Sequence, residues 1–317
     1  MKETHWSTRT AQEIVENVAK VIIGKKPVIE RALAAVIAQG HLLIEDVPGV
    51  GKTMLAKSIS VSIGCTFKRI QFTPDLLPSD IVGVSIYNQG TGEFQFRPGP
   101  VMSQVVLVDE INRATPKTQS ALLEAMEELQ VSVDGVTRPL ERPFVVMATQ
   151  NPIEYEGTFP LPEAQLDRFL MRISMGYPSF AEELSVIGGQ EKTHPIDQLE
   201  AVASSDDVIK LQGAAKNVYV DTAVREYIVS LIEATRNHED VSLGASPRAS
   251  LGMFRAVRAM AIFRDRDYVI PDDVKELAYA VLAHRLILSS AARMRGLQTR
   301  QVIDGLLESV AVPGASC

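Results

Sequence analysis

A glycine loop between a short apolar run and a helix constrains this chain more than any other feature. Residues 49–53 read Gly-Val-Gly-Lys-Thr, and the apolar run 42–44 precedes them. Glycines let backbone N–H groups turn towards phosphate oxygens, and the N-terminus of the following helix adds partial positive charge. Lys52 would reach the β- and γ-phosphates of a nucleoside triphosphate, and the Thr53 hydroxyl would ligate Mg2+. The residues predicted to bind nucleotide here are Pro48, Gly49, Val50, Gly51, Lys52, Thr53 and Met54.

Two acidic residues at the end of another apolar run match the second motif of a nucleotide site. Residues 105–108 read Val-Val-Leu-Val, and Asp109 and Glu110 follow. Asp109 suits the outer coordination shell of magnesium, and Glu110 can polarise an attacking water. A lone glycine loop is often a chance match, but the two motifs together predict an ATP site with Mg2+. Lys52 and Glu110 are the expected catalytic residues, and Thr53 and Asp109 are the expected metal ligands.

One position departs from the usual loop pattern. The pattern GxxxxGK[ST] would place its first glycine at position 46, where this chain has Asp46. A carboxylate that faced bound phosphates would repel them. We therefore expect the Asp46 side chain to face away from the nucleotide.

Size and composition bound the remaining possibilities. With roughly 150 residues per domain, a chain of 317 residues has room for about two domains. No apolar run approaches the roughly 18 residues of a membrane span. The formal net charge of −7 argues against a general nucleic-acid-binding surface, although a local basic groove stays open. Cys65 and Cys317 form no motif and the N-terminus has no apolar signal region, so we expect a cytoplasmic protein.

Strand and helix patterns alternate along the first part of the chain. Two hairpins interrupt them at about 82–97 and 130–140, the second around the turn pair Asp134-Gly135. After Tyr177-Pro178 the strand patterns stop and only helix starts follow. The sequence therefore predicts an α/β domain over 1–178, with a parallel sheet and helices on both faces, and a smaller all-helical domain over 179–317.

Five short strings together match one family over nearly the whole chain. They are DVPGVGKT, VLVDEINRA, ATQNP, LPEAQLDRF and GASPRAS. With them the chain resembles the MoxR family of AAA+ ATPases. The resemblance implies a P-loop AAA+ domain, a helical lid and ATP hydrolysis in a homo-oligomeric ring, expected to be a hexamer. It also implies work on client proteins, often enzymes with metal cofactors, and partners that contain von Willebrand A domains.

The resemblance also assigns roles to single residues. Asn151 ends the strand where the family carries its sensor-1 residue, and its amide could orient the water; the alternative is an Asn-Pro turn. Arg168 matches the arginine finger that a neighbouring subunit supplies; the alternatives are a surface pair with Asp167 or Glu163, or Arg172 in the same role. Arg248 matches the sensor-2 arginine, which reaches back from the lid to the phosphates; the alternative is an arginine on the helix surface. The segment with Val21, Ile22 and Gly24 resembles the adenine side of the site; the alternative is plain core packing.

Three further expectations concern exposed or switching side chains. We expect at least one of Phe94 and Phe96 to lie in the core, with the hairpin tips exposed for partners. Gln71 is expected to hold Glu110 in an inactive rotamer, as a polar residue on that strand does in many AAA+ proteins. Arg113 either lines the ring or contacts the next subunit, or it makes a surface ion pair.

Three other functions stay open at this point. A nucleic-acid motor or loader belongs to the same superfamily, but the acidic composition argues against it. A magnesium-chelatase-like ATPase subunit belongs to a related clade, and tetrapyrrole-dependent stimulation would identify it. A nucleotide-gated scaffold without turnover is disfavoured, because both Glu110 and Arg168 are present.

Overall fold

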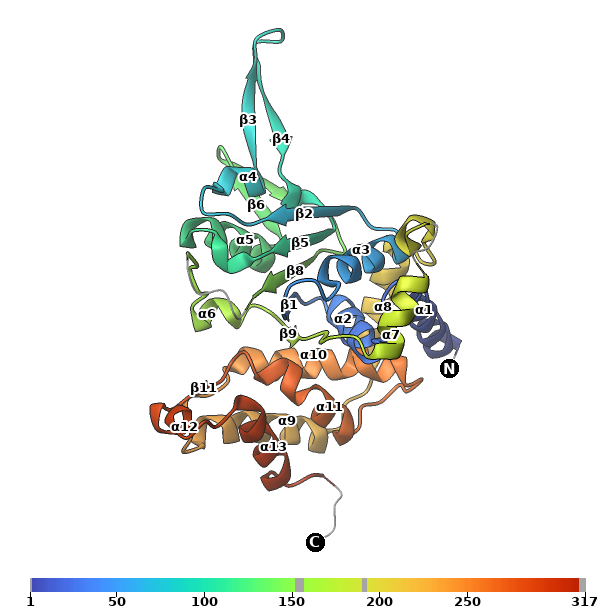
Figure 1. Cartoon of the computed structure of the whole chain (residues 1–317), viewed down its shortest axis with the longest axis vertical. Helices are drawn as coiled ribbons and strands as arrows, with labels where there is room; N and C mark the ends of the chain where they lie inside the picture. Colours follow the sequence, from blue (N-terminus) through green and yellow to red (C-terminus); the bar gives the residue numbers. More distant parts are fainter. Residues whose placement is uncertain (1, 152–156, 190–192, 314–317) are drawn as a thin grey trace.

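The computed structural model describes residues 2–151, 157–189 and 193–313. Pro152 of the ATQNP string and Cys317 lie outside these ranges. A long hairpin projects from one end of the molecule, an α/β layer lies in the middle, and a group of helices forms the other end (Figure 1). No helix of the described ranges is long and apolar enough to cross a membrane.

The central sheet has five strands, all parallel. Its order is β2-β5-β8-β1-β9. The strands are β1 (Leu42–Glu45), β2 (Phe67–Gln71), β5 (Val105–Asp109), β8 (Val145–Gln150) and β9 (Met171–Ile173). Because all strands run the same way, their carboxyl ends lie at one end of the sheet and their amino ends at the other. The predicted parallel sheet is confirmed.

Helices cover both faces of the sheet, because successive strand side chains point to opposite faces. Leu42 and Ile44 of β1 join the core beneath α1 (Lys2–Ala19), α2 (Lys26–Ile37) and α3 (Lys52–Ser62). Leu43 of the same strand joins a second core with α4 (Pro78–Val82) and α5 (Pro116–Glu128). Short helical turns complete this part, namely η1 (Pro100–Met102), η2 (Ile111–Arg113) and α6 (Glu163–Leu166).

Both inserted hairpins are present. They are β3 (Gly83–Asn88) with β4 (Glu93–Pro98), and β6 (Gln130–Val133) with β7 (Val136–Pro139). Phe94 is 74% exposed, and its ring packs on Tyr87 with centroids 5.3 Å apart. Phe96 is half-buried beneath the Arg138 guanidinium, 3.9 Å from the ring centroid. The expectation that one of these phenylalanines lies in the core is wrong, because the first hairpin projects away from the α/β layer and neither ring joins a buried cluster (Figure 1).

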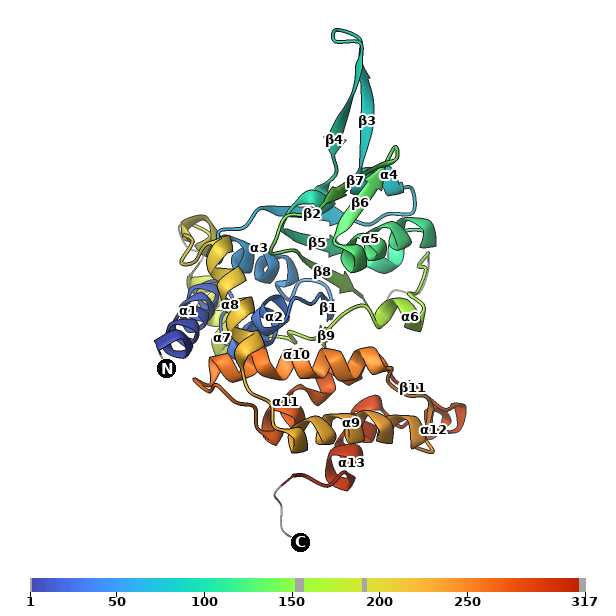
Figure 2. The same ribbon diagram turned by 180° about the vertical axis from the view of Figure 1, so that it is seen from behind.

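The region after residue 178 is helical, as expected. Ser204, Asp221 and Ser246 each cap a helix by accepting a backbone N–H. Helix α8 packs against α1 and α2 as well as α10 (Figure 2). The helices are α7 (Phe180–Gly188), η3 (Pro195–Gln198), α8 (Ser205–Asn217), α9 (Thr222–Asn237), α10 (Pro247–Phe263), α11 (Pro271–Leu282), α12 (Ser290–Met294) and α13 (Thr299–Ser309). A ribbon of β10 (Val241–Leu243) and β11 (Ile287–Leu288) is an addition that the sequence analysis missed.

Candidate active site

The glycine loop joins β1 to α3 at the carboxyl end of the sheet. Gly49 and Gly51 have φ of 86° and 94°, a region that favours glycine, so the loop conformation depends on them. Lys52 begins α3, and its Nζ donates to the backbone oxygen of Asp46 at 2.6 Å. The lysine ammonium is therefore folded across the loop, at the N-terminus of a helix where an anion is stabilised.

Asp46 faces away from the loop interior, as expected. Its Oδ2 accepts from Ser174 Oγ, Met175 N and Gly176 N at 2.9, 2.7 and 2.7 Å. Its Oδ1 accepts from Val47 N at 2.8 Å. Burial alone would raise the pKa of Asp46, but these hydrogen bonds outweigh it and lower the pKa below the ordinary value. The carboxylate thus fastens the glycine loop to the segment that follows β9.

Asp46→Asn should destabilise the protein in a pH-dependent way. Because the folded-state pKa of Asp46 lies below that of the unfolded chain, about 3.9, the ionised form contributes stability above that pH. That contribution is lost as pH falls through the folded-state pKa. Chemical denaturation should show the largest difference in unfolding free energy from wild type between about pH 5 and 8, shrinking below about pH 4. Asp304→Asn controls for net charge, and a difference that stays constant down to pH 3.5 would contradict this account.

The two carboxylates at the end of β5 have different surroundings. Asp109 is only 6% exposed, and its Oδ1 accepts from Thr149 Oγ1 at 3.1 Å. Its Oδ2 accepts from Arg69 Nε at 2.5 Å. The same Thr149 hydroxyl accepts from Glu110 N at 3.0 Å, so one side chain of β8 fixes both acidic residues.

Glu110 is half-buried and follows β5 at the carboxyl end of the sheet. Its backbone has φ of 57° and ψ of 53°, the left-handed region, which is uncommon for a glutamate. Its Oε2 accepts from Gln71 Nε2 at 2.7 Å and from Arg113 Nη1 at 2.9 Å. The predicted Gln71–Glu110 contact is present. Of the two readings for Arg113, the structure shows an ion pair, and its partner is Glu110.

Asn151 follows β8, which lies between β5 and β1 in the sheet. Ligand crevices of open α/β sheets occur at the carboxyl ends of the strands. Asn151 is 6% exposed. Because it follows β8, it lies between the acidic pair that ends β5 and the glycine loop that follows β1. The structure brings together Lys52, Thr53, Asp109, Glu110 and Asn151 at this end of the sheet.

The expected adenine side is the turn between α1 and α2. Ile22 is 6% exposed and Val21 packs partly buried against the same core. Gly24 has φ of 74°, and a β-carbon there would lie 1.7 Å from Glu182 Oε1 of α7. Lys25 adds a bond from Nζ to the backbone oxygen of Tyr177 at 2.9 Å. Glycine at position 24 therefore lets α7 close against this turn.

Arg168 and Arg248 lie elsewhere, at the amino end of the sheet. Arg168 precedes β9, whose first residue pairs with Leu42 at the start of β1. The carboxylate of Glu127 binds both arginines, with Oε2 3.0 Å from Arg168 Nε and Oε1 2.5 Å from Arg248 Nη2. The glycine loop follows the other end of β1, roughly 13 Å away for four residues at about 3.3 Å each. In one chain, therefore, neither arginine lies at its own glycine loop.

The surface alternative for Arg168 required an ion pair with Asp167 or Glu163, and the structure shows neither. Arg172, the competing candidate for the same role, binds Glu45. The Arg172 Nη1 to Glu45 Oε2 distance is 2.7 Å. Asp167 accepts from Arg285 Nε at 2.7 Å and from Ser246 Oγ at 2.7 Å. Arg168 is thus held by a glutamate from the distant helix α5.

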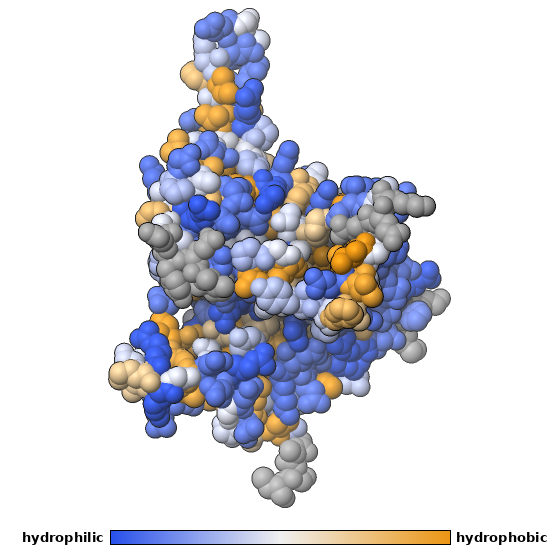
Figure 3. Space-filling view, viewed as in Figure 1, coloured by the Kyte–Doolittle hydropathy of each residue, from blue (hydrophilic) through white to orange (hydrophobic). Residues whose placement is uncertain are grey.

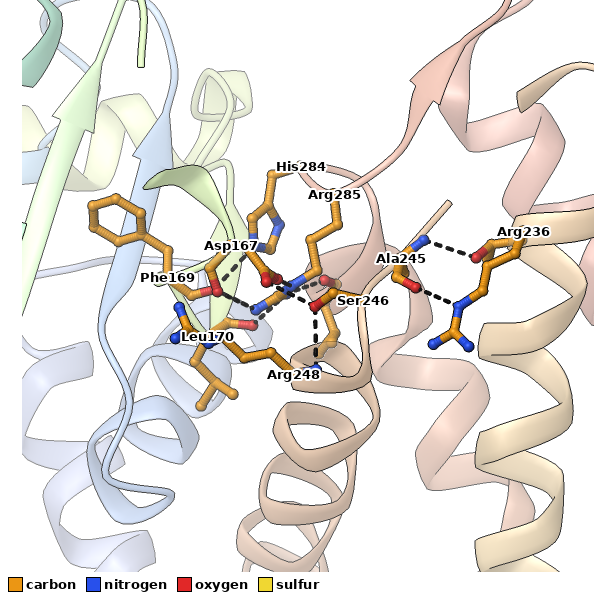
Figure 4. Close-up of polar contacts among 11 residues, drawn as sticks. Asp167, Phe169, Leu170, Arg236, Ala245, Ser246, Arg248, His284 and Arg285 are labelled. Carbon is orange, nitrogen blue, oxygen red and sulfur yellow. Dashed lines mark hydrogen bonds and ion pairs between the residues drawn. The ribbon is translucent and has the colours of Figure 1, made fainter. Parts of the chain in front are cut away.

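Arg285 fixes the segment that carries Arg168, and the sequence analysis missed it. Its side chain is 2% exposed and donates to the backbone oxygens of Asp167, Phe169 and Leu170 at 3.2, 2.6 and 3.1 Å (Figure 4). His284 Nε2 lies 3.0 Å from the same Phe169 oxygen. An arginine inside the apolar run 280–288 was the available signal, because a cation in such a run must be buried with partners.

Comparisons with known proteins match both parts of the chain. Residues 41–171 match the ATPase family associated with various cellular activities (AAA), and residues 233–306 match the AAA lid domain. The uncharacterised protein YeaC of Bacillus subtilis is 56% identical over 299 residues, which cover 94% of this chain and 93% of that protein. Chaperone MoxR1 of Mycobacterium tuberculosis is 47% identical, over 96% of this chain and 82% of that protein.

A solved structure gives the same result for the fold. A candidate ATPase from Cytophaga hutchinsonii superposes with a TM-score of 0.91 at 41% identity, over 98% of this chain and 97% of that one. Protein MoxR of Paracoccus denitrificans is 32% identical over 93% of this chain. The predicted α/β fold with a helical lid is confirmed, and the chain belongs to the MoxR family of AAA ATPases.

Proposed function

We propose that this ATPase forms a ring, expected to be a hexamer, that uses ATP to remodel or activate client proteins. The observation that supports it is the division of the candidate site between the two ends of the sheet. The glycine loop and the acidic pair lie at the carboxyl end, and Arg168 and Arg248 lie at the amino end. A second copy that presents its amino end to the first completes the site, and repetition of this head-to-tail contact closes a ring.

The donor set at the carboxyl end fits magnesium. The Thr53 hydroxyl at the start of α3 and the Asp109 carboxylate supply oxygen ligands, which this ion prefers. Asp109 pairs with the Arg69 guanidinium at 2.5 Å, so a bound magnesium ion would share this carboxylate with Arg69. Thr53 and Asp109 would hold the ion, which would supply neutralisation of charge on the phosphate oxygens of the substrate.

In the proposed mechanism the chain positions a water and stabilises charge. Glu110 first leaves Gln71 and Arg113, and its carboxylate then orients the water and takes its proton. The Asn151 amide holds the same water. Lys52 of one subunit, with Arg168 and Arg248 of the next, binds the phosphate oxygens where negative charge develops. Arg248 therefore links the lid of one subunit to the nucleotide of its neighbour, so that nucleotide state and lid position influence each other.

The first hairpin provides a surface for the client or for a partner with a von Willebrand A domain. Its exposed apolar side chains include Val84, Ile86, Tyr87 and Phe94, which are 43, 43, 52 and 74% exposed. Such a cluster on a projecting element marks an interaction site more often than a packing site. Figure 3 shows apolar side chains along this hairpin, and a further apolar area over α7.

Phe94→Ser should weaken partner binding while ATP hydrolysis stays near the wild-type rate. The aromatic pair with Tyr87 lies on the projecting hairpin, away from the nucleotide residues, and aromatic anchors carry much of the energy of an interface. Affinity capture with the Glu110→Gln protein in ATP should recover the partner, and addition of Phe94→Ser should reduce recovery roughly 10-fold or more. Met294→Ser removes another exposed apolar side chain, 84% exposed on α12, as a control. Equal recovery with both variants, or salt-sensitive DNA binding as the sole interaction, would contradict the proposal.

A further inference from the structure

A cavity at the amino end of the sheet carries more positive charge than its acidic side chains can balance. Its volume is about 270 Å³, and it lies between α5, the segment before β9, and the lid helix α10. Two carboxylates line it, those of Glu127 and Asp167. The arginines that line it are Arg142, Arg168, Arg248, Arg255 and Arg285. We call it the arginine cavity.

Both carboxylates of the arginine cavity already have partners. Glu127 gives one oxygen to Arg168 and the other to Arg248, at 3.0 and 2.5 Å. Asp167 binds Arg285 at 2.7 Å and also accepts from Ser246. Each of the four carboxylate oxygens therefore already accepts from one side chain of the cavity, and three arginines share these two negative charges.

The histidine in the wall of the cavity adds no charge. Burial lowers the pKa of His41 to about 4. Its Nδ1 accepts from Val146 N at 3.0 Å, and Nε2 lies 3.0 Å from the backbone oxygen of Met126, to which it donates. Because the ring is neutral and both of its nitrogens are used, the charges that line the cavity are those of its five arginines and of Glu127 and Asp167.

Of the two α10 arginines that line the cavity, Arg248 binds Glu127, whereas Arg255 has no counter-ion among the described residues. It lies two turns after Arg248 on α10, at the i+7 spacing that places both on one helix face. Within the described ranges, no carboxylate or carbonyl oxygen pairs with its side chain. Arg255 is exposed as a whole residue, but partial desolvation of its guanidinium, and then repulsion from Arg248, lower its pKa. Arg285 in the same cavity is different, because its guanidinium binds one carboxylate and several backbone oxygens. These contacts give Arg285 a structural role, and Arg255 has none of them.

We propose that Arg255 is a third phosphate-contacting arginine, which binds the terminal phosphate of ATP held by the adjacent copy of this chain. This inference rests on the proposed ring. A terminal phosphate carries about two negative charges at neutral pH, whereas Glu127 offers one that Arg168 and Arg248 already share. Arg255 supplies a guanidinium that Glu127 does not neutralise. It therefore attracts the phosphate towards Arg168 and Arg248 and adds a charge-assisted hydrogen bond.

Arg255→Gln should lower kcat by roughly 10- to 100-fold, the range for loss of one charge-assisted hydrogen bond in the transition state. Nucleotide binding to the variant's own glycine loop should be unchanged. Arg255→Lys, which keeps the charge, should retain more activity than Arg255→Gln. The matched control is Arg258→Gln on the same helix, because Arg258 stacks over Phe254 at 5.0 Å and does not line the arginine cavity. Wild-type kcat in Arg255→Gln, or equal losses in Arg255→Gln and Arg258→Gln, would overturn the assignment.

Mixed rings separate this inference from the proposed function. A mixture of Arg255→Gln with Lys52→Ala should regain activity, because an intact glycine loop then meets an intact arginine cavity. A mixture of Arg255→Gln with Arg168→Ala should not, because every contact lacks one of the two arginines. If Arg168→Ala and Lys52→Ala complement each other but Arg255→Gln and Lys52→Ala do not, Arg255 does not act across the contact. If neither pair complements, the proposed ring site fails as well.

Discussion

Replacing Glu110 with glutamine is expected to lower the rate of ATP hydrolysis by roughly 10²-fold or more, the scale of a lost general base. A glutamine keeps the shape of the side chain, and its carbonyl oxygen can still accept from Gln71 and Arg113, which bind Glu110 at 2.7 and 2.9 Å. It cannot take a proton from water. Steady-state phosphate release measures the loss, and equilibrium binding of a fluorescent ATP analogue should stay at the wild-type level.

Lys52→Ala gives the matched comparison for that result. It removes the ammonium that begins α3 beside the glycine loop, so tight nucleotide binding should be lost together with hydrolysis. The two variants therefore separate binding from chemistry. Wild-type turnover in Glu110→Gln would show that another group acts as the base.

Arg168→Ala should bind nucleotide and hydrolyse it about 10³-fold or more slowly, the range for loss of an arginine finger. The reason is its place: the side chain lies at the amino end of the sheet, in an ion pair of 3.0 Å with Glu127, away from its own glycine loop. Arg172→Ala is the control for the competing assignment, because Arg172 binds Glu45 at 2.7 Å. A larger loss of turnover in Arg172→Ala than in Arg168→Ala would contradict the choice of Arg168.

The carboxyl end of the sheet could be predicted from the sequence because its signals are local. The glycine loop, the acidic pair after β5 and Asn151 each follow an apolar strand, and parallel strands bring such positions to one end of the sheet. The outward orientation of Asp46 also followed from charge alone. Its hydrogen-bond partners at Ser174, Met175 and Gly176 could not be predicted. They lie far along the chain, and the residues around Asp46 do not indicate which distant segment packs against it.

The amino end could not be predicted in the same way, because it is assembled from distant segments. Glu127 meets Arg248, 121 residues later, and Asp167 meets Arg285, 118 residues later. These ion pairs depend on how the lid packs against the sheet, and the hydrophobic periodicity of the sequence does not predict that packing. The β10–β11 ribbon was missed for another reason, since strands of three and two residues are too short for an alternating pattern.

The most direct test of the composite site is the ATPase activity of mixed Arg168→Ala and Lys52→Ala rings. One variant keeps its glycine loop and the other keeps its Arg168, so every contact that pairs the two intact halves should hydrolyse ATP. Light scattering and co-purification of differently tagged subunits establish that mixed rings form in ATP. The account predicts activity well above that of either variant alone. Mixed rings with no gain in activity would contradict a site shared between subunits.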